Sequence, residues 1–136
     1  MTRTAGAKKP AQELRRNGRV RVVASGSSMW PRLRHGAVLE VTPVRGRELL
    51  PGDLVVFSGR GKLVTHRVLA VSPRGVESFG DSQAGSDGVI PFRRILGRAR
   101  IVSQPPLRPR LPAVADAQRL ASAARWAMLV WLMRWL

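Results

Sequence analysis

The sequence predicts a mainly β fold, in which a compact antiparallel β domain is followed by an amphipathic C-terminal helix. Short runs rich in valine, isoleucine and leucine fill the middle of the chain and are separated by glycine, proline and aspartate. Helical periodicity is missing from this stretch, and a proline-rich segment then precedes a run of good helix formers. With 136 residues, the chain has room for one domain with a modest core.

Six runs have the length and composition of β-strands. They cover residues 19–23, 37–44, 53–57, 63–71, 75–79 and 95–102. Proline and glycine mark turns at Pro51-Gly52-Asp53 and Ser72-Pro73-Arg74-Gly75. The second turn joins two of the runs, which predicts a hairpin. We therefore place the β domain at residues 19–103.

The segments on either side of the β domain have a different composition. Residues 1–18 are polar and basic and contain no apolar run, which predicts a disordered lead-in without the apolar core of a signal peptide. Residues 104–112 contain four prolines, which neither a sheet nor a helix accommodates, and they predict an extended linker.

Residues 113–136 predict the helix. Polar residues recur at every third position, at Asp116, Arg119, Ser122 and Arg125. Residues 126–136 are apolar except for Arg134, a run shorter than the roughly 20 apolar residues of a membrane-spanning helix. This pattern favours a helix on a membrane surface, with tryptophans at headgroup depth: Trp126, Trp131 and Trp135. Packing on the β domain or on a partner is the second interpretation, and a true span is the third.

The charge balance predicts an anionic partner. The formal net charge is +16, and 21 of the 24 basic residues are arginines. Basic groups crowd both flanks, which attracts the chain to acidic lipid headgroups and tends to keep it on the cytoplasmic side of a membrane. We therefore expect membrane association at the cytoplasmic face, with a soluble cytoplasmic protein as the second choice. Without tyrosine, and with three of four tryptophans in the tail, no specific nucleic acid is expected as a partner.

Residues with catalytic chemistry lie within the predicted β domain. Ser28 belongs to a serine- and glycine-rich turn, where a hydroxyl can be exposed and backbone N–H groups can face a substrate. A serine nucleophile needs a base, and His66 lies in a β-branched strand. Asp81 and Asp87 each offer a carboxylate to orient an imidazole. The chain contains no cysteine, which excludes a cysteine nucleophile and a thiolate metal site, and we expect no cofactor.

Four ordered segments resemble the type I signal peptidase family and its relatives, the self-cleaving SOS repressors. Ser28-Met29-Trp30-Pro31 matches the Ser-Met-x-Pro motif that holds the nucleophile of that family, and Gly52-Asp53 begins a hydrophobic strand as in the family pattern. His66-Arg67-Val68 matches the segment of the base, which is histidine in the microsomal and archaeal branch. Gly80-Asp81 with Asp87 follows, and 96–100 is similar to the closing strand. The resemblance covers roughly residues 20–103.

The resemblance implies a serine endopeptidase with a signal-peptidase-like fold and a polypeptide substrate. In the mechanism that the resemblance implies, Ser28 attacks the scissile carbonyl and His66 takes the proton from the Ser28 hydroxyl. Asp87 orients His66, and Asp81 is the second candidate for this orienting role. The backbone N–H of Ser28, helped by Ser25 or Ser27, is expected to stabilise the oxyanion. An imidazole ordinarily titrates at about pH 6.5, so a histidine base suits cleavage near neutral pH.

Other interpretations stay open at this point. Lys62 is the nearby lysine that could replace His66 as the base, although its glycine-flanked turn indicates a solvated side chain. Asp53 is expected to be a turn residue and His35 a surface residue. Secretory members of the family carry an N-terminal membrane segment, which is not seen here, so a specialised peptide substrate is expected rather than bulk preprotein. The alternative function is a non-catalytic β module that binds membrane or a protein partner.

Overall fold

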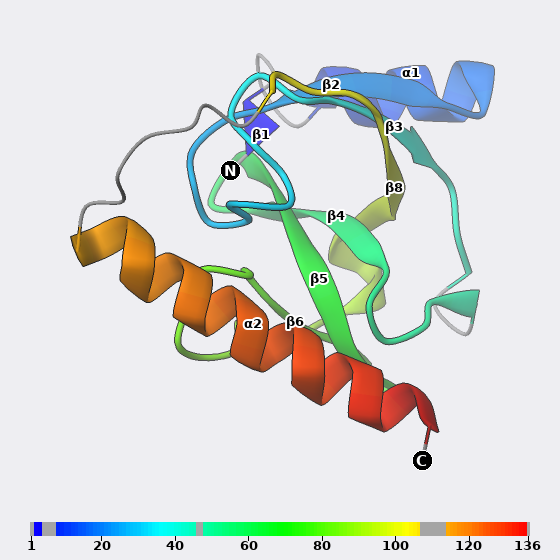
Figure 1. The fold of residues 1–136 in the computed structure, drawn as a ribbon. Coiled ribbons are helices and arrows are strands. Elements are labelled where there is room, and N and C mark those ends of the chain that lie inside the picture. Colours follow the sequence, from blue (N-terminus) through cyan, green and yellow to red (C-terminus); the bar gives the residue numbers. More distant parts are fainter. Residues whose placement is uncertain (1, 4–7, 46–47, 107–113, 136) are drawn as a thin grey trace.

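Figure 1 shows the computed structural model of the chain, which describes residues 2–3, 8–45, 48–106 and 114–135, with the side chains of residues 9–45, 48–106 and 121–134. The elements in chain order are β1 (Thr2–Arg3), α1 (Lys8–Asn17), β2 (Val20–Ala24), β3 (Val38–Thr42), β4 (Leu54–Gly59), β5 (Lys62–Ser72), β6 (Gly75–Phe79), β7 (Val89–Ile90), a 3-10 turn (Phe92–Arg94), β8 (Ile95–Ser103) and α2 (Val114–Trp135).

The predicted mainly β fold with a C-terminal helix is confirmed. All pairings in the sheet are antiparallel, in the order β1-β2-β3-β8-β4-β5-β6-β7. A further pairing of β1 with β5 closes β1, β2, β3, β8, β4 and β5 into a ring of strands. Arg100 on β8 donates a hydrogen bond to Glu40 on β3 (2.9 Å), and this bond lowers the pKa of the Glu40 carboxyl.

Apolar side chains fill both faces of the sheet because the strands alternate. On β4, Val56 joins one buried cluster, whereas its neighbours Val55 and Phe57 join the other. The first cluster lies under α1 and the Ser28 turn and includes Leu14 and Met29. A central strand that is buried on both faces leaves no side for solvent, so the polar residues in the middle of β5, Thr65, His66 and Arg67, lie in the interior of the protein.

The expectation of a disordered lead-in at residues 1–18 is wrong for residues 2–3 and 8–17, which form β1 and α1. Leu14 is buried in the first apolar cluster, and Gly18, with a φ of 71°, donates its N–H to the Leu14 carbonyl at the end of the helix. Only Leu14 and Pro10 are buried along the described side chains of α1. Two contacts of this kind dock a helix without producing the apolar run by which sequence analysis recognises one.

The C-terminal helix packs on the β domain through one stripe of its surface. Trp126 stacks on Phe79 of β6 (centroid distance 4.5 Å, interplanar angle 26°) and donates its indole N–H to the Gln83 carbonyl (2.6 Å). One turn further on, Val130 is buried, and Arg134 donates to the Pro51 carbonyl (2.8 Å). Spacings of four residues place these side chains on one side of α2, which lies across the sheet in Figure 1. Trp126 therefore packs on the β domain, as the second interpretation of this helix expects, and its placement at headgroup depth stays a prediction.

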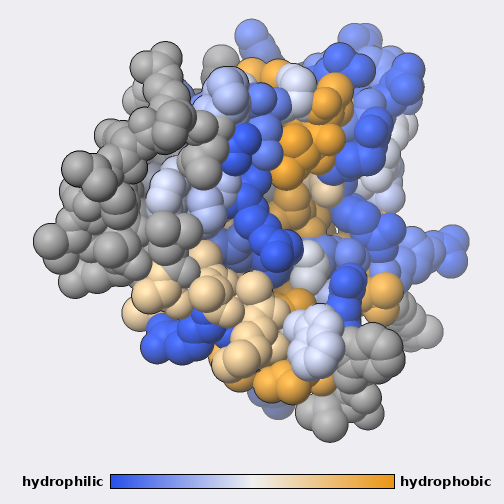
Figure 2. All heavy atoms as spheres, viewed as in Figure 1, coloured by the Kyte–Doolittle hydropathy of each residue, from blue (hydrophilic) through white to orange (hydrophobic). Residues whose placement is uncertain are grey.

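Most of the remaining described surface of α2 is apolar, with Ser122 and Arg125 as its polar residues. Its large exposed side chains are Met128, Leu129, Trp131, Leu132 and Met133. Figure 2 shows orange and tan spheres along this helix, next to hydrophilic blue side chains of the domain. Among the described residues, no helix is long and apolar enough to cross a bilayer. The side chains of Asp116, Arg119 and Trp135, which were assigned roles in the helix, lie outside the described residues.

Replacing Leu14 by alanine is expected to lower the free energy of unfolding by about 2–5 kcal/mol, because it leaves a cavity under α1. Glu13→Ala, at the exposed neighbouring position, is the control and should change it by less than about 0.5 kcal/mol. Urea unfolding followed by circular dichroism measures both. Equal stability of the Leu14→Ala variant and the unchanged protein would contradict the packing of α1 on the sheet.

Candidate active site

Ser28 and His66 meet at one end of the ring of strands. Ser28 lies in the turn that follows β2, and His66 is the fifth residue of β5. The Nε2 atom of His66 is 3.2 Å from the Ser28 hydroxyl oxygen. The imidazole is buried, with 5% of its side chain exposed, so its position is set by protein contacts and not by solvent. A serine hydroxyl at hydrogen-bond distance from a histidine is the arrangement that nucleophilic catalysis requires.

Asp87 lies on the other side of the imidazole. One of its carboxylate oxygens, Oδ2, is 2.5 Å from Nδ1 of His66. A carboxylate only accepts hydrogen bonds, so it selects the tautomer in which Nδ1 carries the hydrogen. In the neutral ring, Nε2 then has its lone pair toward the Ser28 hydroxyl. Of the two aspartates expected to orient His66, Asp87 is the one that contacts it.

Ser78 holds Asp87 in this position, a role that sequence analysis missed. The Ser78 hydroxyl donates to Oδ2 of Asp87 (2.7 Å), and the Asp87 N–H donates to the Ser78 carbonyl (2.7 Å). Ser78 is fully buried on β6, at a position where the apolar pattern of the strand predicts a hydrophobic residue. That mismatch between residue type and burial was the available signal, because buried hydroxyl groups need a partner.

A second missed contact is aromatic. The ring of Phe57 on β4 meets the His66 imidazole edge to face, with centroids 6.0 Å apart and an interplanar angle of 75°. Arg94 lies 6.0 Å from the Phe57 centroid and donates to the Ser58 carbonyl (2.8 Å). The imidazole is thus supported on its side by packing and at its Nδ1 end by Asp87.

The Ser28 turn is anchored to the segment that follows β6. The Ser82 N–H donates to the Ser28 carbonyl (2.9 Å), and the Ser82 hydroxyl donates to the Ser27 carbonyl (2.6 Å). Met29 is buried, and its sulfur accepts the N–H of Asp81. A Cβ at Gly80 would lie 2.8 Å from the Ser28 carbonyl oxygen, so only glycine permits this approach. The Gly80-Asp81 pair of the motif is therefore explained by contact with the nucleophile turn.

Asp81 does not orient His66, which corrects the second candidate for that role. Both of its carboxylate oxygens accept hydrogen bonds from Arg67, at 2.8 Å each. Arg67 also donates to the Gly52 carbonyl (2.8 Å) and is buried, as is Asp81. The pair ties together the turns at Gly52 and Gly80. The side chains of Arg67 and His66 point to opposite faces of β5, which is why neighbouring residues serve different partners.

The other candidates lie away from the imidazole or in supporting roles. Lys62 is exposed at the start of β5, opposite Gly59. His35 is exposed, and its Nδ1 accepts the Gly26 N–H (3.2 Å), so it contacts the nucleophile turn from outside. Asp53 accepts the Leu50 N–H (2.8 Å), as a turn residue does. Within the part of the chain that the structure describes, no group of three or more metal-ligating side chains is present.

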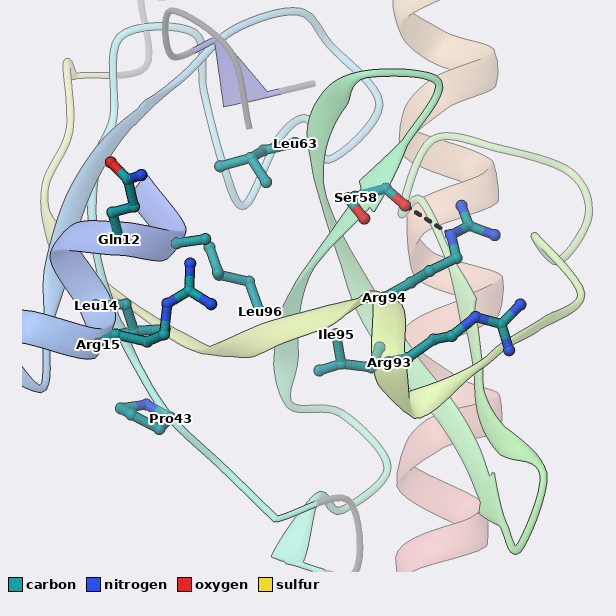
Figure 3. Close-up of a pocket in the computed structure, with 11 residues that line it drawn as sticks. Gln12, Leu14, Arg15, Pro43, Ser58, Leu63, Arg93, Arg94, Ile95 and Leu96 are labelled. Carbon is teal, nitrogen blue, oxygen red and sulfur yellow. Dashed lines mark hydrogen bonds between the residues drawn. The ribbon is translucent and has the colours of Figure 1, made fainter. Parts of the chain in front are cut away.

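An apolar groove lies between α1 and the start of β8. It has a volume of about 660 Å³. Leu14, Leu63 and Leu96 contribute aliphatic surface, and Arg15 and Arg93 also line it. Figure 3 shows the groove residues on α1, β4, β5 and β8 surrounding one open space. Leu63 precedes His66 by three residues on β5, so the Leu63 side chain that lines the groove and the imidazole lie on opposite faces of this strand.

Comparison of the chain with protein-family models, with curated proteins and with solved structures finds no match. The function is therefore inferred from the residues and their geometry.

Asp81→Asn is expected to lower the free energy of unfolding by about 3–5 kcal/mol, because it leaves the buried Arg67 guanidinium without its charged partner. Asp87→Asn should cost less, about 1–3 kcal/mol, because it removes hydrogen bonds from a carboxylate that is one-fifth exposed. Denaturant unfolding of the two variants measures the difference. A larger loss for Asp87→Asn would mean that the structural and orienting roles are assigned to the wrong aspartates.

Proposed function

We propose that this protein is a serine endopeptidase of the signal-peptidase type, with Ser28 as nucleophile, His66 as general base and Asp87 as the orienting carboxylate. The observation that carries the proposal is the continuous polar chain from Ser28 through both nitrogens of His66 to Asp87. Ser78 supports Asp87 by donating a hydrogen bond to its carboxylate, so this series of hydrogen bonds does not end on an unpaired carboxylate.

The chemistry follows from these positions. As the Ser28 oxygen forms a bond to the scissile carbonyl carbon, its proton moves to Nε2 of His66. Collapse of the tetrahedral intermediate breaks the C–N bond, and the imidazolium returns the proton to the leaving amine. Water then adds to the acyl-enzyme, with His66 again as base, and releases the new carboxyl terminus. Asp87 stabilises the transient imidazolium, and the Ser28 N–H is the proposed donor to the oxyanion.

The buried setting supports a reactive dyad. His66 lies in the interior beside Phe57, where the Asp87 carboxylate acts through a lower dielectric than water provides. The Ser28 turn is pinned through its carbonyl and through Met29, so the hydroxyl stays near Nε2 without a large ordering cost during reaction.

The alternative is a non-catalytic module that keeps this site but cuts nothing. In that case the unchanged protein would bind a polypeptide or a membrane and show no cleavage, and Ser28→Ala would bind equally well. The endopeptidase is favoured because a buried histidine within reach of both a serine and a carboxylate can act as the general base that activates the serine.

We also propose that α2 holds the protein on an anionic lipid surface, with the catalytic domain at the cytoplasmic face. The apolar outer side of α2 supports this placement, with Trp131 59% and Met128 58% exposed. The net charge of +16 complements acidic headgroups rather than a second, equally basic copy of the chain. Trp126, Val130 and Arg134 keep the opposite side of the helix on the domain.

Ser28→Ala or His66→Ala is expected to reduce peptide cleavage by roughly 10³-fold or more, and Asp87→Asn by roughly 10²–10⁴-fold. Ser103→Ala, at an exposed serine at the end of β8, is the matched control and should retain activity. The assay incubates each purified protein with detergent micelles and a mixed peptide library. Mass spectrometry then maps every cut, including cuts in the protein itself. Absence of cleavage by the unchanged protein would favour the non-catalytic module.

Binding to vesicles of equal parts phosphatidylglycerol and phosphatidylcholine should fall about ten-fold or more in Met128→Glu/Leu132→Glu, because charges enter the apolar side of α2. Val89→Glu/Val102→Glu adds the same charge at exposed valines outside α2 and is the control. Cosedimentation measures binding at low and high salt, and ultracentrifugation measures self-association. Equal loss of binding in both variants, or a dimer that dissociates only in the α2 variant, would contradict the lipid contact.

A further inference from the structure

The C-terminal helix is hydrogen-bonded to the segment that follows β6, residues 80–88. Trp126 donates its indole N–H to the Gln83 carbonyl (2.6 Å), and Arg125 lies 3.4 Å from the Ala84 carbonyl. Figure 1 shows α2 passing over this segment. Within the described residues, these are the hydrogen bonds that join residues 83–86 to parts of the fold outside 80–88. The middle of the segment is therefore held by α2.

The two ends of this segment hold the two sides of the candidate active site. Ser82 donates hydrogen bonds to the carbonyls of the Ser28 turn, and Asp87 contacts the His66 imidazole. Residues 83–86 between them are exposed, and a Cβ at Gly85 would meet no atom within 4 Å. An exposed stretch with so few packing contacts opens easily by itself. Its hydrogen bonds to α2 therefore limit the movement of both ends.

Gln83 connects Trp126 to the nucleophile turn. The Gly80 N–H donates to the side-chain oxygen of Gln83 (3.1 Å), and the Gln83 N–H donates to the Gly80 carbonyl (2.9 Å). Gly80 is the residue whose backbone approaches the Ser28 carbonyl so closely that a Cβ would lie 2.8 Å from it. A displacement of Gln83 is thus passed to Gly80 and from there to the backbone of Ser28.

The other end of α2 contacts the second turn of the site. Arg134 donates to the Pro51 carbonyl (2.8 Å), and a Cβ at Gly52 would lie 3.1 Å from a Val130 methyl group. The turn at Gly52 is the one that Arg67 joins to Asp81 in the interior. The helix therefore spans, from outside, the same two turns that the buried ion pair joins from inside.

We propose that Trp126 is a positioning residue of the active site: through Gln83 it fixes the segment that holds both the Ser28 turn and Asp87. The full rate of cleavage then requires that α2 is docked on the β domain. This inference rests on the proposed endopeptidase for its effect on the rate. Trp126 acts through Gln83 and touches none of the reacting groups.

Few contacts hold α2 in place, so a single substitution should release the segment. Of the described side chains of α2, only Val130 is buried. The stacking of Trp126 on Phe79 and its hydrogen bond to Gln83 are therefore a large part of the docking contact. A misplacement of about 1 Å at a catalytic group can cost about 100-fold in rate, so even a small release is measurable.

The experiment compares three variants. Trp126→Ala removes both the stacking and the hydrogen bond, whereas Trp126→Phe keeps an aromatic ring for Phe79 and lacks the N–H donor. Val41→Ala is the control for a general loss of stability. It leaves a cavity at a fully buried position, and Val41 pairs with Val20, at the opposite end of β2 from Ser28.

The first readout does not depend on cleavage and uses a Ser28→Ala background. Proton NMR follows the downfield resonance of the proton between His66 and Asp87, and hydrogen exchange follows the bonded amides of Ser82, Gln83 and Asp87. In Trp126→Ala the resonance should broaden or vanish, and these amides should exchange about ten-fold or more faster. Trp126→Phe should change both in the same direction by less, and Val41→Ala should change neither.

The second readout is steady-state cleavage with Ser28 present. Trp126→Ala should lower kcat by about ten-fold or more and leave KM within about two-fold, because the substitution disturbs the catalytic groups. An unchanged resonance and unchanged exchange in Trp126→Ala overturn the proposal. The same changes in Val41→Ala also overturn it, since they would follow from lost stability. A raised KM at unchanged kcat overturns it as well, because Trp126 would then act in substrate binding.

The two readouts separate this inference from the endopeptidase itself. If the unchanged protein cuts peptides and Trp126→Ala cuts them at the same rate, the positioning role fails and the enzyme remains. If the unchanged protein never cuts while the resonance and the exchange respond to Trp126→Ala, the enzyme fails. The control of the Ser28–His66–Asp87 geometry by α2 then remains.

Discussion

The buried contact between Arg67 and Asp81 is the interaction on which the arrangement of the site depends. It joins two turns far apart in sequence, because Arg67 also binds the Gly52 carbonyl. The Asp81 turn in turn holds the carbonyls of Ser27 and Ser28 through Ser82. Burying such an ion pair costs free energy, and separating its buried partners costs still more, so the two turns are held together. The nucleophile is therefore positioned by a charge pair that takes no part in its chemistry.

Adjacent residues on β5 divide these roles between the two faces of the sheet. Arg67 stabilises the frame, whereas His66 turns toward Ser28 and Asp87. Strand alternation makes this division possible, because a catalytic group and its supporting ion pair can be neighbours in sequence without sharing a solvent cavity. Ser78 and Phe57 complete the surroundings of the imidazole from the strands on either side of β5.

The N-terminal strand and the C-terminal helix both pack against the central strands. The N-terminal strand fills the gap between β2 and β5, and α2 lies against the end of β6 through Trp126 and Phe79. An open edge offers unsatisfied backbone groups, so it attracts any extended chain, whether internal or external. Closure of the ring of strands therefore depends on pairing of the N-terminal strand with both β2 and β5.

Much of the fold and of the site could be predicted from local patterns. Alternating apolar runs and turn residues determined the six main strands, and the order of the serine, histidine and aspartate motifs singled out Ser28, His66 and two aspartates. The resemblance ranked Asp87 before Asp81 as the partner of His66, but the local pattern gave no physical reason for that order, because each is a carboxylate after β6. The tertiary structure supplied the reason, by placing Arg67 beside Asp81 and His66 beside Asp87. It likewise decided that Leu14 docks α1, that Trp126 faces Phe79, and that β1 enters the sheet. These contacts join residues distant in sequence, and their energy comes from burial and charge pairing that no local pattern records.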